Sequence, residues 1–428
     1  MINIRKLNIL LSYFMMVLLA IPIFKAPFWG SSYALIMAAI IGLWLITAIM
    51  IDSKAVCSNS LQLQVWLLIV FYIVCAVLNL GTIKCVLISI TTPWCPMIIF
   101  LFYMKRRDYT GFKIIVKWAF VTLALTMVTT LYGLATNSYL SRVFGTLDVA
   151  SRRSYMFQNV GDISFIYVAG LLFVLMASLL FTINEHIARK ERNILLIVAI
   201  SCFALAILGS SGITLMSVAV SSIIIMLYAV KNQRIRIVLI IMVITVSVIV
   251  YASGALREFF VQLSRESSNV YLSSKFSSIA DSLSTGSATG DLGARLDRYA
   301  NDWNLFINSF GFGIGPYYGG TGNVTSIYVA DHSQLFADLA RYGIIFLAYI
   351  LILHKRFIRI MKELEDYCGI HYSIAPIVVC YAIMYCSQPI MSQPIMGYFV
   401  FIVWPGLPLL LSHRIPSKKN AYIHNDDH

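Results

Sequence analysis

The sequence predicts an all-α integral membrane protein, with a single polytopic domain over residues 1–428. The chain of 428 residues is 59% hydrophobic and only 12% charged, and its mean hydropathy is +0.82. These values lie outside the range of soluble globular domains. Apolar stretches of about 20 residues, the length that a helix needs to cross a bilayer core, recur from one end to the other.

These stretches predict about twelve transmembrane helices. In chain order they cover residues 7–24, 33–51, 61–80, 84–104, 112–134, 163–183, 194–208, 213–230, 235–252, 334–353, 373–388 and 394–412. The first follows Arg5 and Lys6 but has no small-residue cleavage site before a soluble domain. We therefore interpret it as a retained span and not as a signal peptide.

Basic residues orient the predicted spans, because Lys and Arg resist translocation. The segments "KRRDYTGFK", "EHIARKERN", "KNQRIR" and "HKRFIRIMK" all fall on one side when both termini are cytoplasmic. The net charge of +13 is therefore mostly topological and does not indicate nucleic-acid binding. The 8 cysteines lie in or beside helices or on the cytoplasmic side, and they predict no disulfide framework.

Two connections are long, residues 135–162 and 253–333, and both face outward in this topology. Long loops on a packed membrane scaffold commonly carry function. Within the second, "LGARLDRYANDWNLFINSF" has helical periodicity and predicts an amphipathic helix. Its apolar stripe consists of Leu292, Leu296, Tyr299, Trp303, Phe306 and Phe310, with Arg295, Arg298 and Asp302 along the polar border. The Gly and Pro residues of "GFGIGPYYGGTGN" then predict turns.

His332 is the one histidine that this topology places outside, so an imidazole that transfers protons on the outer face must be this residue. Asp331 and Gln334 have the spacing of a capping box, which would place His332 in the first turn of the next helix. The helix dipole there favours neutral imidazole, whereas the Asp331 carboxylate favours the protonated form. A hydrated residue at a helix start is an equally good interpretation.

Further along the same predicted helix, Gly343 lies eleven residues after His332 and therefore on nearly the same helix face. Asp338 and Arg341 are three residues apart and could neutralise each other facing the protein interior. A proton or ion pathway is the alternative interpretation of this pair.

Arginine supplies nearly all the positive charge of the outer loops. Its planar fork binds phosphate oxygens bidentately and keeps its charge. Two clusters, Arg142 with Arg152 and Arg153, and Arg295 with Arg298, share the face of His332 and favour a common anionic ligand. The alternative is an amphipathic helix whose arginines meet lipid headgroups. The outer loops have no zinc spacing, P-loop or dinucleotide fingerprint, so we expect neither a metal nor a cofactor.

The arginine helix around Arg295, the "GFGIGP" turn, "DHSQLFADLARYG" and the earlier "FQNVGD" together resemble the bacterial O-antigen polymerase and O-antigen ligase superfamily. The resemblance is best over residues 292–353. It implies a C-type glycosyltransferase fold in the bacterial inner membrane, active at the periplasmic face. It also implies inverting, metal-independent transfer between undecaprenyl diphosphate-linked oligosaccharides. His332 would be the base or orienting group for the acceptor hydroxyl; Arg295 or Arg298, with Arg142, Arg152 or Arg153, would hold the diphosphate.

Two departures favour the polymerase. The ligase pattern often has Asn after the histidine and an Asn-Pro-Asn element, where this chain has Ser333 and Gln158-Asn159-Val160. A ligase would use the same donor and deliver the glycan to a lipid A core sugar. A lipid-linked oligosaccharide flippase or another twelve-helix transporter fits the span count, but it needs polar groups near the bilayer midplane, and the predicted spans have few.

The resemblance also implies the partners of the chain. These are the lipid-linked donor and acceptor and the membrane lipids, with a chain-length regulator and a flippase beside them. Nucleic acid is not among the expected partners.

Overall fold

A computed structural model describes the architecture of the chain over eleven main ranges, with isolated positions between them. These ranges are residues 3–20, 31–57, 63–70, 94–136, 187–208, 212–230, 232–267, 270–314, 333–370, 374–387 and 394–412. Every element within them is helical. This confirms the predicted all-α class for the described part of the chain.

Four of the described helices include a stretch long and apolar enough to cross a membrane: Leu35–Val56, Tyr109–Thr136, Gln233–Ala252 and Gln334–Cys368. Shorter apolar helices cover Trp94–Lys105, Ala375–Ser387 and Met396–Leu411. The predicted spans 61–80, 84–104 and 163–183 fall wholly or partly outside the described residues. The total of about twelve spans and their orientation therefore stay predictions.

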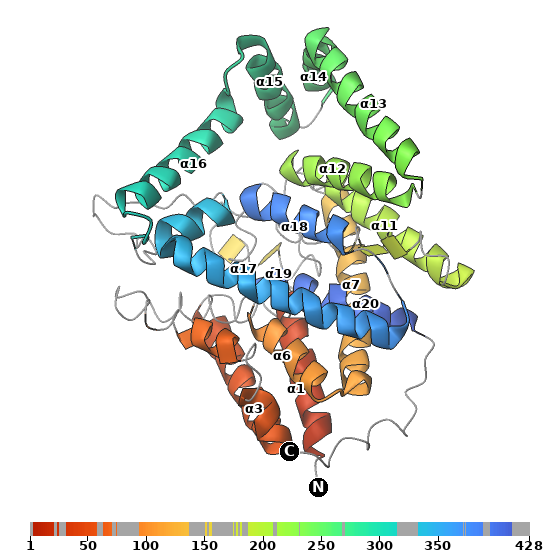
Figure 1. Ribbon diagram of the computed structural model, residues 1–428, viewed down its shortest axis with the longest axis vertical. Coiled ribbons are helices and arrows are strands. Elements are labelled where there is room, and N and C mark those ends of the chain that lie inside the picture. The colour runs from red at the N-terminus through yellow and green to blue at the C-terminus, as the bar shows by residue number, and fades with distance from the viewer. Residues whose placement is uncertain are drawn as a thin grey trace.

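The helices near the N-terminus pack around a hydrogen-bonded polar network. It joins α1 (Ile4–Ala20), α3 (Ser31–Cys57) and α6 (Trp94–Lys105), which lie beside α7 (Tyr109–Thr136) (Figure 1). The buried Asn8 amide donates to the Thr47 hydroxyl at 2.9 Å and accepts from the Tyr103 hydroxyl at 2.8 Å. The Trp44 indole donates to the Ser12 hydroxyl at 2.9 Å. Because each group has a partner, the network fixes the helices without leaving a buried polar atom unsatisfied.

The C-terminal span, predicted over residues 394–412, passes through the main aromatic core. It consists of α19 (Pro394–Tyr398), a π-helical turn η3 (Phe399–Val403) and α20 (Trp404–Leu411). Phe357 of α17 packs edge to face against Phe401, with ring centroids 4.9 Å apart, and against Phe100 at 5.2 Å. These contacts join α17 (Gln334–Cys368) to the helices near the N-terminus.

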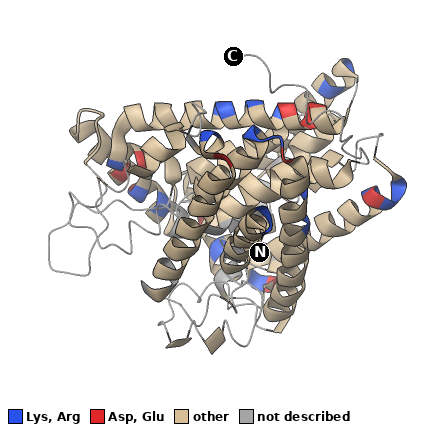
Figure 2. Ribbon diagram, turned by 90° about the horizontal axis from the view of Figure 1, so that it is seen from below, with Lys and Arg blue, Asp and Glu red and all other residues tan. Residues whose placement is uncertain are grey.

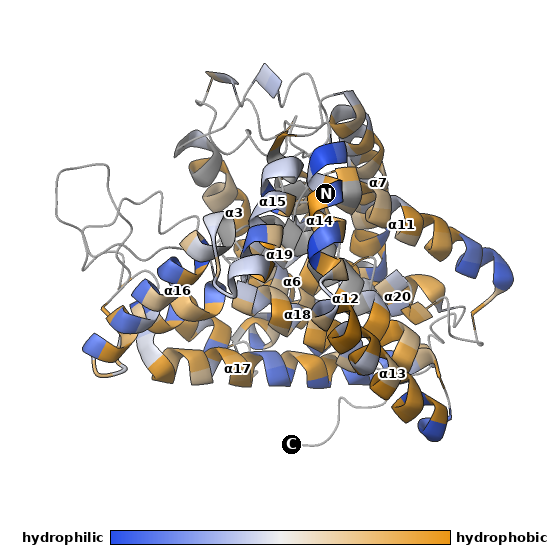
Figure 3. Cartoon of the chain, turned by 90° about the horizontal axis from the view of Figure 1, so that it is seen from above, coloured by the Kyte–Doolittle hydropathy of each residue, from blue (hydrophilic) through white to orange (hydrophobic). Residues whose placement is uncertain are grey.

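The long predicted outer loop is largely helical. After α11 (Arg189–Leu208), α12 (Gly212–Ala229) and α13 (Gln233–Ala252), the chain forms α14 (Ala255–Glu266), α15 (Val270–Thr285) and α16 (Gly290–Asn308). Figure 1 shows α13 to α16 framing the end of the molecule opposite the termini, with α16 descending to the start of α17. Figure 3 shows that hydrophilic and hydrophobic residues alternate around α16, as the sequence predicts for an amphipathic helix.

α17 is longer than predicted and is broken once. The predicted span ends at residue 353, but the helix continues to Cys368 and takes in the basic segment 354–362. Figure 2 shows basic residues gathered along this part of the helix. The break lies at Gly343, whose φ of 76° and ψ of −175° interrupt the helical geometry. α18 (Ala375–Ser387) packs alongside α17, and α12 packs against α18.

The turn that follows α16 closes onto this break, and we call the junction the glycine contact (Gly311–Ile314 against Ala340–Ile344). Ile314 N donates to the Ala340 carbonyl at 2.8 Å, and Ile344 N donates to the Gly311 carbonyl at 3.0 Å. A Cβ atom added to Gly343 would clash with the Gly311 carbonyl oxygen. Only a residue without a Cβ allows the two backbones to approach this closely.

Replacement of Gly343 with alanine should therefore destabilise the protein. The positive φ alone costs on the order of 1–3 kcal/mol for a residue with a Cβ, and the clash with Gly311 adds to it. Thermal unfolding of the detergent-purified protein measures the effect. Gly42→Ala in α3 is the matched control, because a Cβ there meets no atom within 4 Å. Equal melting temperatures for the two variants would contradict the role of the glycine contact.

Candidate functional site

Two of the six predicted site residues lie in the described part of the chain. Arg295 and Arg298 are on α16, where Arg295 is half-buried and Arg298 is exposed. The other predictions fall outside the described residues: His332, Arg142, Arg152 and Arg153. The site is therefore built from α16 and from the start of α17, which directly follows His332 in the chain.

Arg295 is anchored where three helices meet. Tyr299 stacks on Phe336 of α17 with ring centroids 5.3 Å apart, and its hydroxyl donates to the Ser387 carbonyl of α18 at 3.3 Å. The Arg295 guanidinium donates to the same hydroxyl. Burial raises the pKa of Tyr299, while the positive charge of Arg295 partly offsets this rise. The hydroxyl thus stays protonated at neutral pH and holds the arginine in place.

The start of α17 differs from the predicted capping box. The helix begins at Gln334, and its N-cap is Ser333, whose hydroxyl accepts a hydrogen bond from Phe336 N at 3.3 Å. The N-cap is therefore Ser333 and not Asp331, so the capping box predicted from Asp331 and Gln334 was wrong. The serine is a good cap in its own right, and it frees the Gln334 side chain for another partner.

Gln334 contributes instead to a buried cluster around Asp338. The Gln334 amide donates to one carboxylate oxygen of Asp338 at 2.8 Å, and the Tyr385 hydroxyl of α18 donates to the other at 2.5 Å. Asp338 is only 4% exposed. The cluster ties the short helical segment between Ser333 and Gly343 to α18.

Further charges are buried where α16 meets α17. Arg341 is 6% exposed and Asp302 is fully buried. Asp338 and Arg341 thus face the interior, as one of the two interpretations predicted. The sequence predicted Asp302 on the polar border of α16, and this prediction was wrong. The Asp302 side chain is buried in the protein interior. A set that contains both signs of charge is less costly to bury than isolated charges.

Together these contacts make a site suited to an anion, which we call the arginine corner: Arg295 and Tyr299 of α16 with the start of α17. The half-buried guanidinium of Arg295 contacts Tyr299, whose ring stacks on Phe336 in the first turn of α17, and the dipole at a helix start favours negative charge. Within the described ranges, no group of three His, Cys, Asp or Glu residues is placed to hold a metal ion.

Fold and site define a class of membrane protein: all-α, with an arginine-bearing amphipathic helix packed against the start of a long apolar helix that is broken at Gly343. Residues 196–351 match a protein family described as O-antigen ligase. The matched segment runs from within α11 to the middle of α17 and includes Arg295, Arg298 and His332. This match supports the resemblance of the chain to the O-antigen polymerase and ligase superfamily. No curated protein matches the chain.

Sequence reasoning missed the supporting residues of this corner. Gln334 and Asp338 have the i, i+4 spacing of a helical side-chain pair, so their contact could have been predicted. Tyr385 could not, because it lies 47 residues further along the chain. The sequence also did not reveal the contact between α17 and α18 at His354. The Nε2 atom of His354 lies 2.9 Å from the Tyr381 hydroxyl oxygen.

Proposed function

We propose that the protein is an O-antigen polymerase that joins undecaprenyl diphosphate-linked oligosaccharide repeats at the periplasmic face of the inner membrane. The observation that carries the proposal is the fixed Arg295 beside the start of α17, the helix that follows His332 in the chain. The family match over residues 196–351 supports glycosyl transfer from a lipid-linked donor.

In the proposed reaction, an acceptor sugar hydroxyl attacks the anomeric carbon of the donor. The new C–O bond forms on the face opposite the diphosphate, whose own C–O bond to that carbon breaks, so the configuration inverts. His332 accepts the hydroxyl proton or orients the hydroxyl. Arg295 or Arg298, with Arg142, Arg152 or Arg153, stabilises the charge that develops on the diphosphate. No metal takes part in this scheme.

The membrane itself contributes to this reaction. Both substrates are anchored in one leaflet, which reduces the search and supplies part of the entropic advantage of a bound pair. In the proposed orientation both termini are cytoplasmic, and the segments 135–162 and 253–333 are periplasmic. A chain-length regulator and a flippase would act next to the protein on the same lipid-linked substrates.

Two alternatives make different demands on the structure. An O-antigen ligase would use the same donor site and would differ in its acceptor, the lipid A core. A flippase needs a polar path through the membrane region. The described polar side chains among the N-terminal helices, such as Asn8 and Ser12, are instead bonded to their neighbours. Their pairing favours the enzyme over the transporter.

Deletion of the gene in its own host distinguishes the three functions. Loss of a polymerase should leave lipopolysaccharide that carries a single repeat, so the ladder of long chains disappears from an electrophoresis gel. Loss of a ligase should leave bare core, while long glycan accumulates on the lipid carrier. Loss of a flippase should leave single repeats on the cytoplasmic side of the membrane. Either of the last two patterns would contradict the proposed function.

A further inference from the structure

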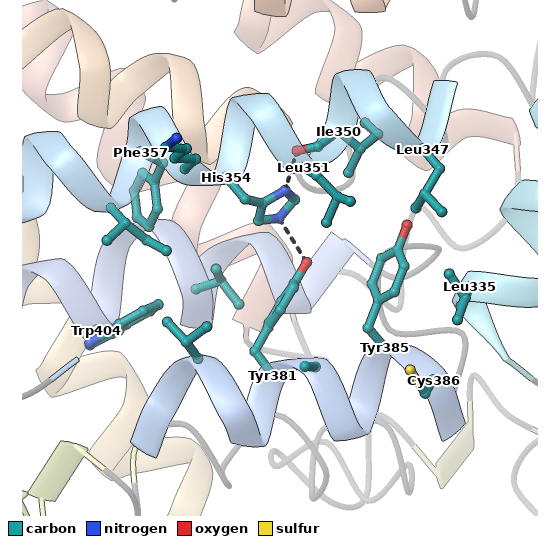
Figure 4. Close-up of a pocket in the computed structure, with 15 residues that line it drawn as sticks. Leu335, Leu347, Ile350, Leu351, His354, Phe357, Tyr381, Tyr385, Cys386 and Trp404 are labelled. Carbon is teal, nitrogen blue, oxygen red and sulfur yellow. Dashed lines mark hydrogen bonds between the residues drawn. The ribbon is translucent and has the colours of Figure 1, made fainter. Parts of the chain in front are cut away.

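An apolar groove of about 420 Å³ runs between α17 and α18, next to the candidate site. Its walls are formed mainly by aliphatic and aromatic side chains of the two helices, and Val400 and Trp404 also line it. Figure 4 shows Leu335, Tyr385 and Cys386 at one end and Phe357 and Trp404 at the other, with Leu351 and His354 between them.

The polar atoms of the groove walls are mostly bonded within the walls. His354 Nδ1 donates to the Ile350 carbonyl at 2.8 Å, which leaves Nε2 to accept from the Tyr381 hydroxyl at 2.9 Å. The Tyr385 hydroxyl donates to Asp338, and the Trp404 indole donates to the Tyr372 hydroxyl. These groups are thus engaged, and the surface offered to a ligand is apolar. Such a surface suits a hydrocarbon chain and not a sugar.

The position of the groove indicates which hydrocarbon chain it holds. At one end, Tyr385 and Leu335 adjoin the Asp338 cluster and therefore the corner that carries Arg295. Along its side, Leu351 is 60% exposed on a helix apolar enough to cross a membrane. A chain that enters from the bilayer could therefore lie in the groove while its headgroup reaches the arginine corner.

We propose that this groove binds the isoprenoid tail of the lipid-linked donor. The inference rests on the proposed function, which supplies a substrate with one long apolar chain and a diphosphate headgroup. The groove holds the tail along α17, and the diphosphate lies at the start of that helix beside Arg295. Tail binding thereby sets the position of the anomeric carbon relative to His332.

Photo-crosslinking tests the groove without any reference to glycan synthesis. The photoreactive residue p-benzoylphenylalanine replaces Leu351 in one variant and Ile352 in another. Ile352 is the matched control, because it is the next residue of α17, is 48% exposed and does not line the groove. Each full-length protein is placed in nanodiscs of phosphatidylethanolamine and phosphatidylglycerol with added undecaprenyl diphosphate. Mass spectrometry then identifies the lipid attached.

The expected result is an undecaprenyl adduct at position 351 that is absent or weak at position 352. Ala382→Trp, which fills the groove from α18, should weaken this adduct by roughly tenfold, because overpacking opposes the ligand. Val379→Trp is its control on the exposed face of α18. Equal undecaprenyl adducts at both positions, or phospholipid acyl adducts alone at 351, would overturn the proposal.

The crosslinking experiment and the gene deletion can fail independently, so they test the groove and the proposed function separately. An undecaprenyl adduct confined to position 351, in a protein whose deletion leaves the lipopolysaccharide ladder intact, supports the groove and contradicts the polymerase. Single-repeat lipopolysaccharide after deletion, together with no undecaprenyl adduct at 351, contradicts the groove and supports the polymerase.

Discussion

Alanine in place of His332 should reduce surface O-antigen to single repeats, with polymerisation slower by about 10²–10⁴-fold. An imidazole that takes the acceptor proton in the transition state contributes acceleration of this size, and alanine removes it entirely. The measurement is the length distribution of lipopolysaccharide glycan in a strain that produces the variant at wild-type level in the membrane. Long chains of normal length would refute a role for His332 in the reaction.

His332→Gln separates the two roles proposed for the histidine. Glutamine can hold an acceptor hydroxyl through a hydrogen bond but cannot accept its proton at neutral pH. Partial recovery of long chains relative to alanine would indicate an orienting group. A defect as large as that of alanine would indicate a base.

Arg295→Lys provides the companion test at the diphosphate. Lysine keeps the positive charge but loses the planar fork that binds two oxygens at once. It also changes the donor that meets the Tyr299 hydroxyl. Arg257→Lys on α14 is the matched control. It is the same substitution at an exposed arginine elsewhere in the predicted outer loop. A ladder shortened in the first variant and normal in the second is the expected result.

Much of this architecture follows from local sequence patterns. The amphipathic helix predicted within residues 292–310 is observed as Gly290–Asn308, and the helix predicted to begin near residue 334 begins at Gln334. Both helices carry apolar residues at helical spacing. The first is followed by a glycine-rich turn, and the second begins after the serine cap. The apolar spacing acts within a few residues of the chain, so it is readable without knowledge of the tertiary fold.

Other features depend on contacts that no local pattern reveals. The helical hairpin of α14 and α15 is rich in serine, and its stability comes from cross-helix bonds such as the one from the Ser264 hydroxyl to the Ser273 carbonyl at 2.9 Å. Gly343 was expected to continue the face of His332 along one helix. The backbone instead breaks there, because the turn at Gly311 approaches from a segment more than thirty residues earlier in the chain.

Asp338 is the second position where a single substitution should have a large effect. Asp338→Ala removes the acceptor of two buried donors, the Gln334 amide and the Tyr385 hydroxyl. A buried donor left without a partner costs about 1–3 kcal/mol, so the loss of folding free energy should be on the order of 2–6 kcal/mol. The melting temperature of the purified protein should fall clearly, and the lipopolysaccharide ladder should disappear because the start of α17 loses its tie to α18.

Asp338→Asn is the matched control for this cluster. An asparagine oxygen can still accept from Gln334, and its amide group can donate to the Tyr385 hydroxyl oxygen, so the side chain keeps a hydrogen bond to each of the two neighbours. We therefore expect asparagine to be far milder than alanine. Tyr385→Phe should lie between them, since it removes one of the two bonds to Asp338. If alanine and asparagine unfolded at the same temperature, the hydrogen bonds of Asp338 would not be what holds α17 to α18.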